Sequence, residues 1–208
     1  VSHEEEWGRL LPALKCSRSF FQGVLLKPLI SLDTRHLESI RRAVDYGVNW
    51  WNDVSGDLSS DKIEFLKGNS LKYVLTHSLG APVDPKKTLD PNQSVCSQVK
   101  TWFMEKIKIL EKAGLGSNRI ILDPGIGFGK TRLQNYELLR NITEFNELPF
   151  PLLVGHSRKS FLNDLTQRDF SDRDVETLAI SLQLKVEVLR VHNPFMHARA
   201  LLAKNHIL

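Results

Sequence analysis

The chain has 208 residues, of which 41% are apolar and 25% are charged, and its formal net charge is +4. These values are typical of a globular protein with one buried core, so we expect residues 1–208 to form a single domain. No apolar run reaches the roughly 20 residues of a membrane span, and the basic residues form no tract typical of nucleic-acid binding.

The cysteines and the first residues indicate a cellular location. Cys16 and Cys96 are far apart and have no CxxC spacing, which is typical of reduced thiols in an intracellular protein. The opening residues are acidic and lack the apolar segment of a signal peptide. We therefore expect a cytoplasmic protein with neither a membrane nor a nucleic-acid partner. The small positive charge suits a small anionic substrate.

The elements predicted in chain order begin with a helix. Ser2 and Glu5 have the spacing of a capping box, and apolar residues follow at helical spacing. A strand over residues 29–33 comes next. Thr34 is expected to cap the following helix, and Gly47 to end it.

The middle of the chain alternates in the same way. We predict strands at 48–53 and 72–77, a short helix near 63–66 and a polar loop from 80 to 91. A long helix at 95–110 has apolar residues three and four apart, and an apolar strand at 120–123 follows.

The C-terminal part repeats the pattern. We predict helices at 135–141, 172–184 and 195–204, and strands at 151–155 and 186–192. Strands that alternate with helices form parallel sheets, either doubly wound or closed into a barrel. A doubly wound sheet would usually show a phosphate-binding fingerprint after its first strand, and none is present.

Polar residues gather at the ends of the predicted strands: Asp33, Asn52, Asp53, His77, Asp123, Arg190 and His192. A (β/α)₈ barrel carries its chemistry on the loops after its strands, so this distribution favours the TIM barrel. A barrel needs eight strands, and we predict about six. We therefore expect the first two strands to be unrepresented in this sequence.

The stretch 120–131 is the most informative part of the chain. An apolar run ends in Asp123, and a loop with glycines at alternate positions follows, which permits close approach to a ligand. Gly129, Lys130 and Thr131 match the end of a phosphate-binding P-loop. That motif needs a glycine where this chain has Pro124, so we reject the P-loop. A connector without chemistry would leave an unpaired carboxylate at a strand end.

Each strand-end residue also has a structural interpretation. Asp33 could cap a helix, Asn52 and Asp53 could form a turn, and His77 could be a satisfied histidine. The basic run 157–160 could be a solvated turn, and Arg190 and His192 could lie on a frayed strand. If the chain is a barrel, however, all these groups converge on one rim.

Five segments together resemble dihydropteroate synthase, in the order of that family. They are residues 31–34, 52–56, 122–130, 155–161 and 190–192. The resemblance covers nearly the whole chain and implies a (β/α)₈ barrel. It also implies that 6-hydroxymethyl-7,8-dihydropterin diphosphate and p-aminobenzoate are joined to form dihydropteroate and pyrophosphate, in folate synthesis.

The resemblance implies roles for particular residues. Asp33, Asn52, Asp123, Lys159 and Arg190 would bind the pterin ring. Arg190 and His192 would meet the diphosphate, so that Lys159, Arg190 and His192 form the catalytic set. Phe128, Arg158 and Ser160 would border the p-aminobenzoate site, where sulfonamides would also bind.

The resemblance further implies Mg²⁺ with the diphosphate, and a homodimer through the last helices. The loop that holds Mg²⁺ in the family is not represented in this sequence. Asn193 stands where an aspartate is usual, and Thr76 where an apolar residue is usual. Two alternatives stay open: a pterin-binding methyltransferase that acts on a corrinoid protein, and a non-catalytic pterin-binding paralogue.

Overall fold

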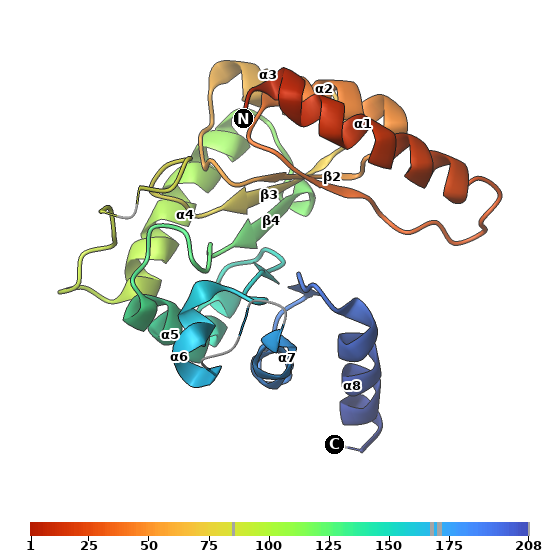
Figure 1. The fold of residues 1–208 in the computed structure, drawn as a ribbon. Coiled ribbons are helices and arrows are strands. Elements are labelled where there is room, and N and C mark those ends of the chain that lie inside the picture. Colours follow the sequence, from red (N-terminus) through yellow and green to blue (C-terminus); the bar gives the residue numbers. More distant parts are fainter. Residues whose placement is uncertain (85, 167–168, 170–171, 208) are drawn as a thin grey trace.

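The computed structural model describes residues 1–84, 86–166, 169 and 172–207 (Figure 1). The helices are α1 (His3–Phe20), α2 (Leu37–Ala43), α3 (Ser60–Lys67), α4 (Val95–Lys112), α5 (Arg132–Arg140), α6 (Asn163–Thr166), α7 (Asp174–Ser181) and α8 (Pro194–Ile207). The strands are β1 (Ser31–Asp33), β2 (Trp50–Asp53), β3 (Lys72–Thr76), β4 (Ile120–Asp123), β5 (Leu153–Val154) and β6 (Val188–Leu189). In the described residues, no helix is long and apolar enough to cross a membrane.

The strands lie side by side in chain order. β1, β2, β3 and β4 form one parallel sheet, and β5 pairs with β6 in parallel. A parallel bridge between Leu122 and Leu152 connects the two sheets. This order has no reversal of the kind that defines a doubly wound sheet, so it matches the predicted barrel.

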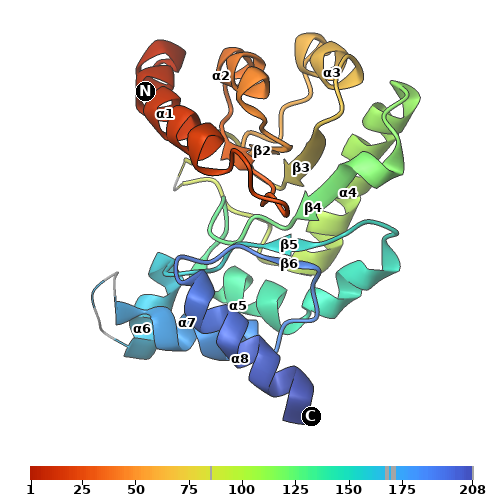
Figure 2. The same ribbon diagram turned by 90° about the vertical axis from the view of Figure 1, so that its right-hand side faces the viewer.

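The helices cover the outer side of the curved sheet. Figure 2 shows α1, α2 and α3 outside the strands at the top of the view, and α5 to α8 outside them at the bottom. Successive side chains of a strand point to opposite faces, so one face packs on the helices and the other turns inward. The carboxyl ends of all the parallel strands therefore meet along one rim.

The two faces have different cores. Trp51, Tyr73 and Leu122 belong to the large buried cluster that includes residues of α4. Val74, Ile121 and Leu153 form a small inner cluster, with Trp50 and Val188 packed against it.

This alternation decides which strand-end residues enter the site. Asn52, Thr76 and Asp123 each lie two places after an inner residue, so they continue the inner face to the rim. Asp53 instead faces the helices. Its carboxylate bonds Lys62 Nζ at 2.7 Å and the Tyr73 hydroxyl at 3.0 Å. Asp53 thus has a structural role, as the structural interpretation of this residue predicted.

Two local predictions can be scored at the start of the chain. The Ser2 hydroxyl accepts a hydrogen bond from Glu5 N, so the predicted cap of α1 is confirmed. The predicted cap at Thr34 is wrong, because α2 begins three residues later and His36 precedes it. The Thr34 hydroxyl instead accepts from His36 N and donates to Glu6, which joins β1 to α1.

Candidate functional site

Polar side chains at the ends of β1, β2 and β3 form a chain of hydrogen bonds across the inner face. The Thr76 hydroxyl donates to Asn52 Oδ1 at 3.1 Å. Asn52 Nδ2 in turn donates to Asp33 Oδ1 at 2.7 Å. Thr76 and Asn52 are almost fully buried, so their orientation is set by these bonds and by the strands.

Arg190 connects this chain to β4. Its Nη1 donates to Asp33 Oδ2 at 2.5 Å, and its Nη2 lies 3.8 Å from Asp123 Oδ2. Gly155 makes this position possible, because a Cβ there would come within 2.8 Å of Arg190 Nε. The guanidinium therefore lies between two carboxylates and covers the inner face below it.

Asp123 is a buried carboxylate with a specific set of donors. Its Oδ1 accepts from Gly125 N at 2.8 Å, and the residue is 1% exposed. Burial raises the pKa of Asp123 above its ordinary value, while Arg190 and the Gly125 N–H act in the opposite direction. A donor-rich heterocycle could replace the guanidinium as partner of this carboxylate.

Lys130 holds the loop after β4 through buried hydrogen bonds. Its ammonium donates to Gly125 O and Phe128 O at 2.9 and 3.0 Å, and lies 2.8 Å from His77 Nδ1. Burial lowers the pKa of Lys130 to about 7 and that of His77 to about 2, so the histidine is a neutral acceptor. These contacts support the structural interpretation of His77 and the rejection of the P-loop.

Close packing explains one glycine of this loop. Gly125 has φ 67°, and a Cβ there would lie 2.0 Å from His77 O. No other residue type fits this approach without moving the backbone of β3 or of the loop. Thr131 ends the loop by capping α5 in a capping box with Gln134.

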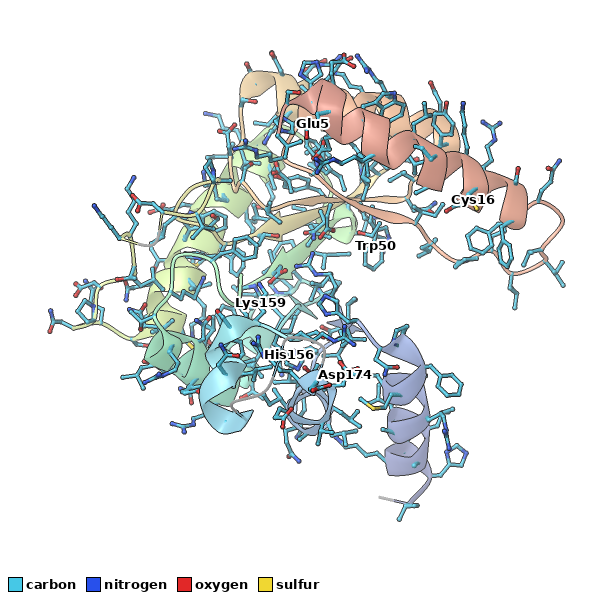
Figure 3. All side chains as sticks on the ribbon, in the orientation of Figure 1. Glu5, Cys16, Trp50, His156, Lys159 and Asp174 are labelled. Atoms are coloured by element: carbon cyan, nitrogen blue, oxygen red, sulfur yellow. The ribbon has the colours of Figure 1, made fainter. Side chains whose placement is uncertain are left out.

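Lys159 reaches the same loop from the segment after β5. Its Nζ donates to Ile126 O and lies 4.3 Å from the centroid of the Phe128 ring. Burial lowers the pKa of Lys159 to about 8, with Asp123 opposing the shift. Lys159 is labelled in Figure 3, near the centre of the molecule.

A cavity of about 330 Å³ opens at this rim. Its lining residues are Asp33, Phe128, Gly155, Ser157, Lys159, Arg190, Val191 and His192. Asn52 and Asp123 are not among them, because they lie buried next to the Arg190–Asp33 pair. The structure thus brings together the residues predicted for the pterin ring, in two layers.

His192 lies at the wall of the cavity and contacts Ser157. Its Nδ1 is 2.9 Å from Ser157 Oγ, which also accepts from His192 N at 3.2 Å. This pair joins the segments that follow β5 and β6. With Arg190 and Lys159, it surrounds the cavity with groups suited to an anion.

Two residues predicted for the p-aminobenzoate side, Arg158 and Ser160, do not line this cavity. The Arg158 guanidinium pairs with Asp174 at the start of α7, and Arg158 is not among the described residues that line the cavity. Ser160 is exposed and does not line it either. Phe128 does line it. The substrate contacts of all three residues stay predictions.

Sequence reasoning assigned no binding or catalytic role to several contributors to this arrangement. Ser157 and Gly155 line the cavity, Thr76 orients Asn52, and Lys130 holds the loop. A glycine and a serine directly after a buried strand are a signal that could have identified the first two residues. The role of Lys130 has no such signal, because its partner His77 is 53 residues away.

The described residues contain no preformed cluster of metal ligands. Among them, no group of three or more histidine, cysteine, aspartate or glutamate side chains is placed to hold a metal ion. Asp33 and Asp123 both face the Arg190 guanidinium.

The chain thus has a parallel, barrel-type sheet with buried carboxamide and carboxylate groups below a rim of cations. Such a rim suits a flat heterocycle that carries an anionic group. The sequence profile of the family described as "Pterin binding enzyme" matches residues 1–192. The chain belongs to this family, which confirms the predicted resemblance and fold class.

Relatives of known name narrow the comparison. A folate synthesis bifunctional protein of Chlamydia caviae is 40% identical over 204 residues, which are 96% of this chain and 45% of that protein. The dihydropteroate synthase of Escherichia coli K12 is 33% identical over 196 residues, 93% of this chain and 67% of that enzyme. The chain thus spans about half the length of the bifunctional relatives it matches.

A solved structure matches over the whole chain. It is the dihydropteroate synthase of Anaplasma phagocytophilum with bound 6-hydroxymethylpterin-monophosphate, with a TM-score of 0.89 and 30% identity. The match covers 100% of this chain and 82% of that one.

Proposed function

We propose that this chain carries the pterin site and the catalytic groups of a dihydropteroate synthase. The observation that carries the proposal is the layered rim, with Asn52 and Asp123 at the floor and Lys159, Arg190 and His192 around the cavity. The relatives support it, because they are named for folate synthesis and a matched structure holds a pterin phosphate.

The floor suits the pterin ring. The edge of a pterin carries N–H donors next to ring acceptors, and carboxylates and a carboxamide complement such an edge. In this structure Arg190 presents its own N–H groups to Asp33 and Asp123. Pterin binding therefore requires the guanidinium to move off the floor, towards the reacting end of the substrate.

The rim suits the departing diphosphate. The bond between the pterin methylene carbon and the ester oxygen breaks, and pyrophosphate leaves with the electron pair. The amine nitrogen of p-aminobenzoate then bonds to the methylene carbon and loses a proton. Lys159, Arg190 and His192 are the groups we assign to stabilising the negative charge on the leaving group. No protein nucleophile is needed.

Magnesium stays part of the proposal as a partner of the diphosphate. When bound, Mg²⁺ would neutralise phosphate charge, as it does in other phosphate chemistry. Most of the ligands of Mg²⁺ in such a complex would be phosphate oxygens and water.

Pyrophosphate release tests the function. The intact protein is incubated with 6-hydroxymethyl-7,8-dihydropterin diphosphate, Mg²⁺ and varied p-aminobenzoate, and a coupled assay follows pyrophosphate. We expect release that saturates with p-aminobenzoate and is competitively inhibited by a sulfonamide. Pterin binding without turnover would instead favour the non-catalytic paralogue. Methyl transfer to a corrinoid protein would favour the methyltransferase.

We also propose a homodimer through α7 and α8. The support is apolar exposure on α8, where Phe195, Leu202 and Ile207 are 72%, 59% and 79% exposed. Sedimentation equilibrium should give twice the chain mass, and Phe195→Asp should shift the distribution towards monomer. A monomer at all protein concentrations would exclude this proposal.

A further inference from the structure

Arg158 has an unusual backbone conformation at a sensitive place. Its φ is 56°, and no other described residue apart from glycine has a positive φ. A Cβ makes this left-handed conformation unfavourable, because it crowds the backbone. Arg158 stands between Ser157 and Lys159, which both line the cavity. The conformation at Arg158 therefore sets the direction in which its two neighbours point.

Three polar groups of Arg158 are bound to the start of α7. Its backbone N–H donates to Thr177 Oγ1 at 3.2 Å, and its carbonyl accepts from Arg173 Nη1 at 2.9 Å. The guanidinium binds Asp174 through two parallel bonds, Nε to Oδ1 at 2.7 Å and Nη2 to Oδ2 at 2.8 Å. This geometry fixes a side chain far better than a single bond, because it sets both distance and plane.

Asn193 completes the cluster. Its Nδ2 donates to Asp174 Oδ2 at 3.2 Å, and its Oδ1 accepts from Met196 N at 3.1 Å at the start of α8. The NH₂ end of the Asn193 side chain must therefore face Asp174. An aspartate here would place a carboxylate oxygen against another carboxylate. Asp174 thus accounts for the amide at position 193, directly after His192.

We propose that the Arg158–Asp174 pair, completed by Asn193, is a positioning device that holds residue 158 in the left-handed conformation and so aims Ser157 and Lys159 at the bound substrates. This inference rests on the proposed synthase function. Arg158 is then a positioning residue that acts through its backbone, and Asp174 acts through Arg158.

Replacing Arg158 with glycine and with alanine separates this role from substrate contact. Both variants lack the guanidinium, but only glycine adopts a positive φ without strain. A left-handed residue with a Cβ is disfavoured by roughly a factor of ten or more. We expect Arg158→Ala to lower kcat/KM about tenfold more than Arg158→Gly. The KM values for p-aminobenzoate and pterin diphosphate are measured separately.

Equal losses in the two variants, at equal Tm, would overturn the proposal, because they would show that the guanidinium itself contacts a substrate. A second comparison uses Asp174→Ala, which we expect to lower kcat/KM in the wild-type background and to have little further effect on Arg158→Gly. Additive losses would contradict a role of Asp174 through Arg158.

Substitutions at position 193 give a gentler test. Asn193→Asp should weaken activity through carboxylate repulsion at Asp174, and Asn193→Ala, which brings no second carboxylate, should weaken it less. If Asn193→Asp is no weaker than Asn193→Ala, Asn193 does not act through Asp174.

Amide hydrogen exchange keeps the inference independent of turnover. Exchange in residues 156–160 should be faster in Arg158→Ala and Asp174→Ala than in the wild type, and close to wild type in Arg158→Gly. This result is expected even if the protein releases no pyrophosphate, in which case the function fails and the positioning device stands. Unchanged exchange in both alanine variants would overturn the device.

Discussion

The two sides of the candidate site differ in how their side chains are held. Asn52, Thr76 and Asp123 lie on strands of four or five residues and are almost fully buried. Lys159 and Arg190 follow strands of only two residues, and the Arg190 side chain is 33% exposed. The first side is a template fixed by the sheet, and the second is a set of charges fixed by hydrogen bonds.

This difference matches the two tasks of the proposed reaction. A flat heterocycle is read best by groups that do not move, whereas a departing anion is met by cations that adjust to it. We therefore expect substitutions in the template to weaken pterin binding. Substitutions on the second side should change kcat/KM and its dependence on pH.

The largest effect is expected at Asp123. Asp123→Asn keeps the shape and removes the charge that we assign to binding the pterin ring, so kcat/KM should fall about a hundredfold or more. Calorimetry should show weakened pterin binding. Asp61→Asn, at an exposed position on α3, is the control. A variant that binds pterin normally would remove Asp123 from the template.

The next largest effect is expected at Lys62, which pairs with Asp53 on the outer face of β2. Lys62→Met leaves the buried Asp53 carboxylate without its ammonium partner, and the free energy of unfolding should fall by about 3 kcal/mol. Urea denaturation measures it. Lys67→Met, at an exposed position on the same helix, should change little. An equally small effect of both variants would mean that the outer face does not support β2.

The second side should respond to pH through Lys159. The pKa of Lys159 is lowered to about 8 by burial, so its charge is present below pH 8 and disappears above it. We expect kcat/KM to decline up to tenfold per pH unit above about 8. In Lys159→Arg the decline should be absent, because arginine stays charged. A decline shared by both proteins would belong to another group.

A second effect of pH, on stability and not on activity, should come from Lys130, which holds the loop after β4. Its folded pKa of about 7 lies under the ordinary lysine value, so the folded state binds fewer protons than the unfolded state between these pH values. Stability should therefore rise with pH across this window, by at most about 1.4 kcal/mol per pH unit, and be lost again as pH falls through 7.

Lys130→Met should flatten this slope, whereas Lys108→Met, at an exposed position on α4, should keep it. Thermal unfolding of the three proteins from pH 7 to pH 10 makes the measurement. A slope that persists without Lys130 would assign it to other groups.

The sequence predicted the template side better than the other side. β4 was predicted with its observed bounds, because an apolar run between turn residues requires burial and ends at Asp123. The strands at 151–155 and 186–192 were predicted too long. Pro151 has no N–H, and Leu152 N donates to the Glu187 carboxylate instead of a neighbouring backbone.

Contacts between distant residues could not be predicted at all. Arg190 and Asp33 are 157 positions apart, and the Arg158–Asp174 pair depends on a backbone angle. Periodicity shows which face a residue occupies, but not which partner it meets. The motifs therefore located the rim, and side-chain packing decided what each residue does there.

Product formation tests the central claim most directly. The intact protein is incubated with 6-hydroxymethyl-7,8-dihydropterin diphosphate, p-aminobenzoate and Mg²⁺, and 7,8-dihydropteroate is detected by mass spectrometry beside the Asp123→Asn variant. We predict product with the wild type and at least a hundredfold less with the variant. Stoichiometric pterin binding by a correctly folded wild type that forms no dihydropteroate would contradict the account.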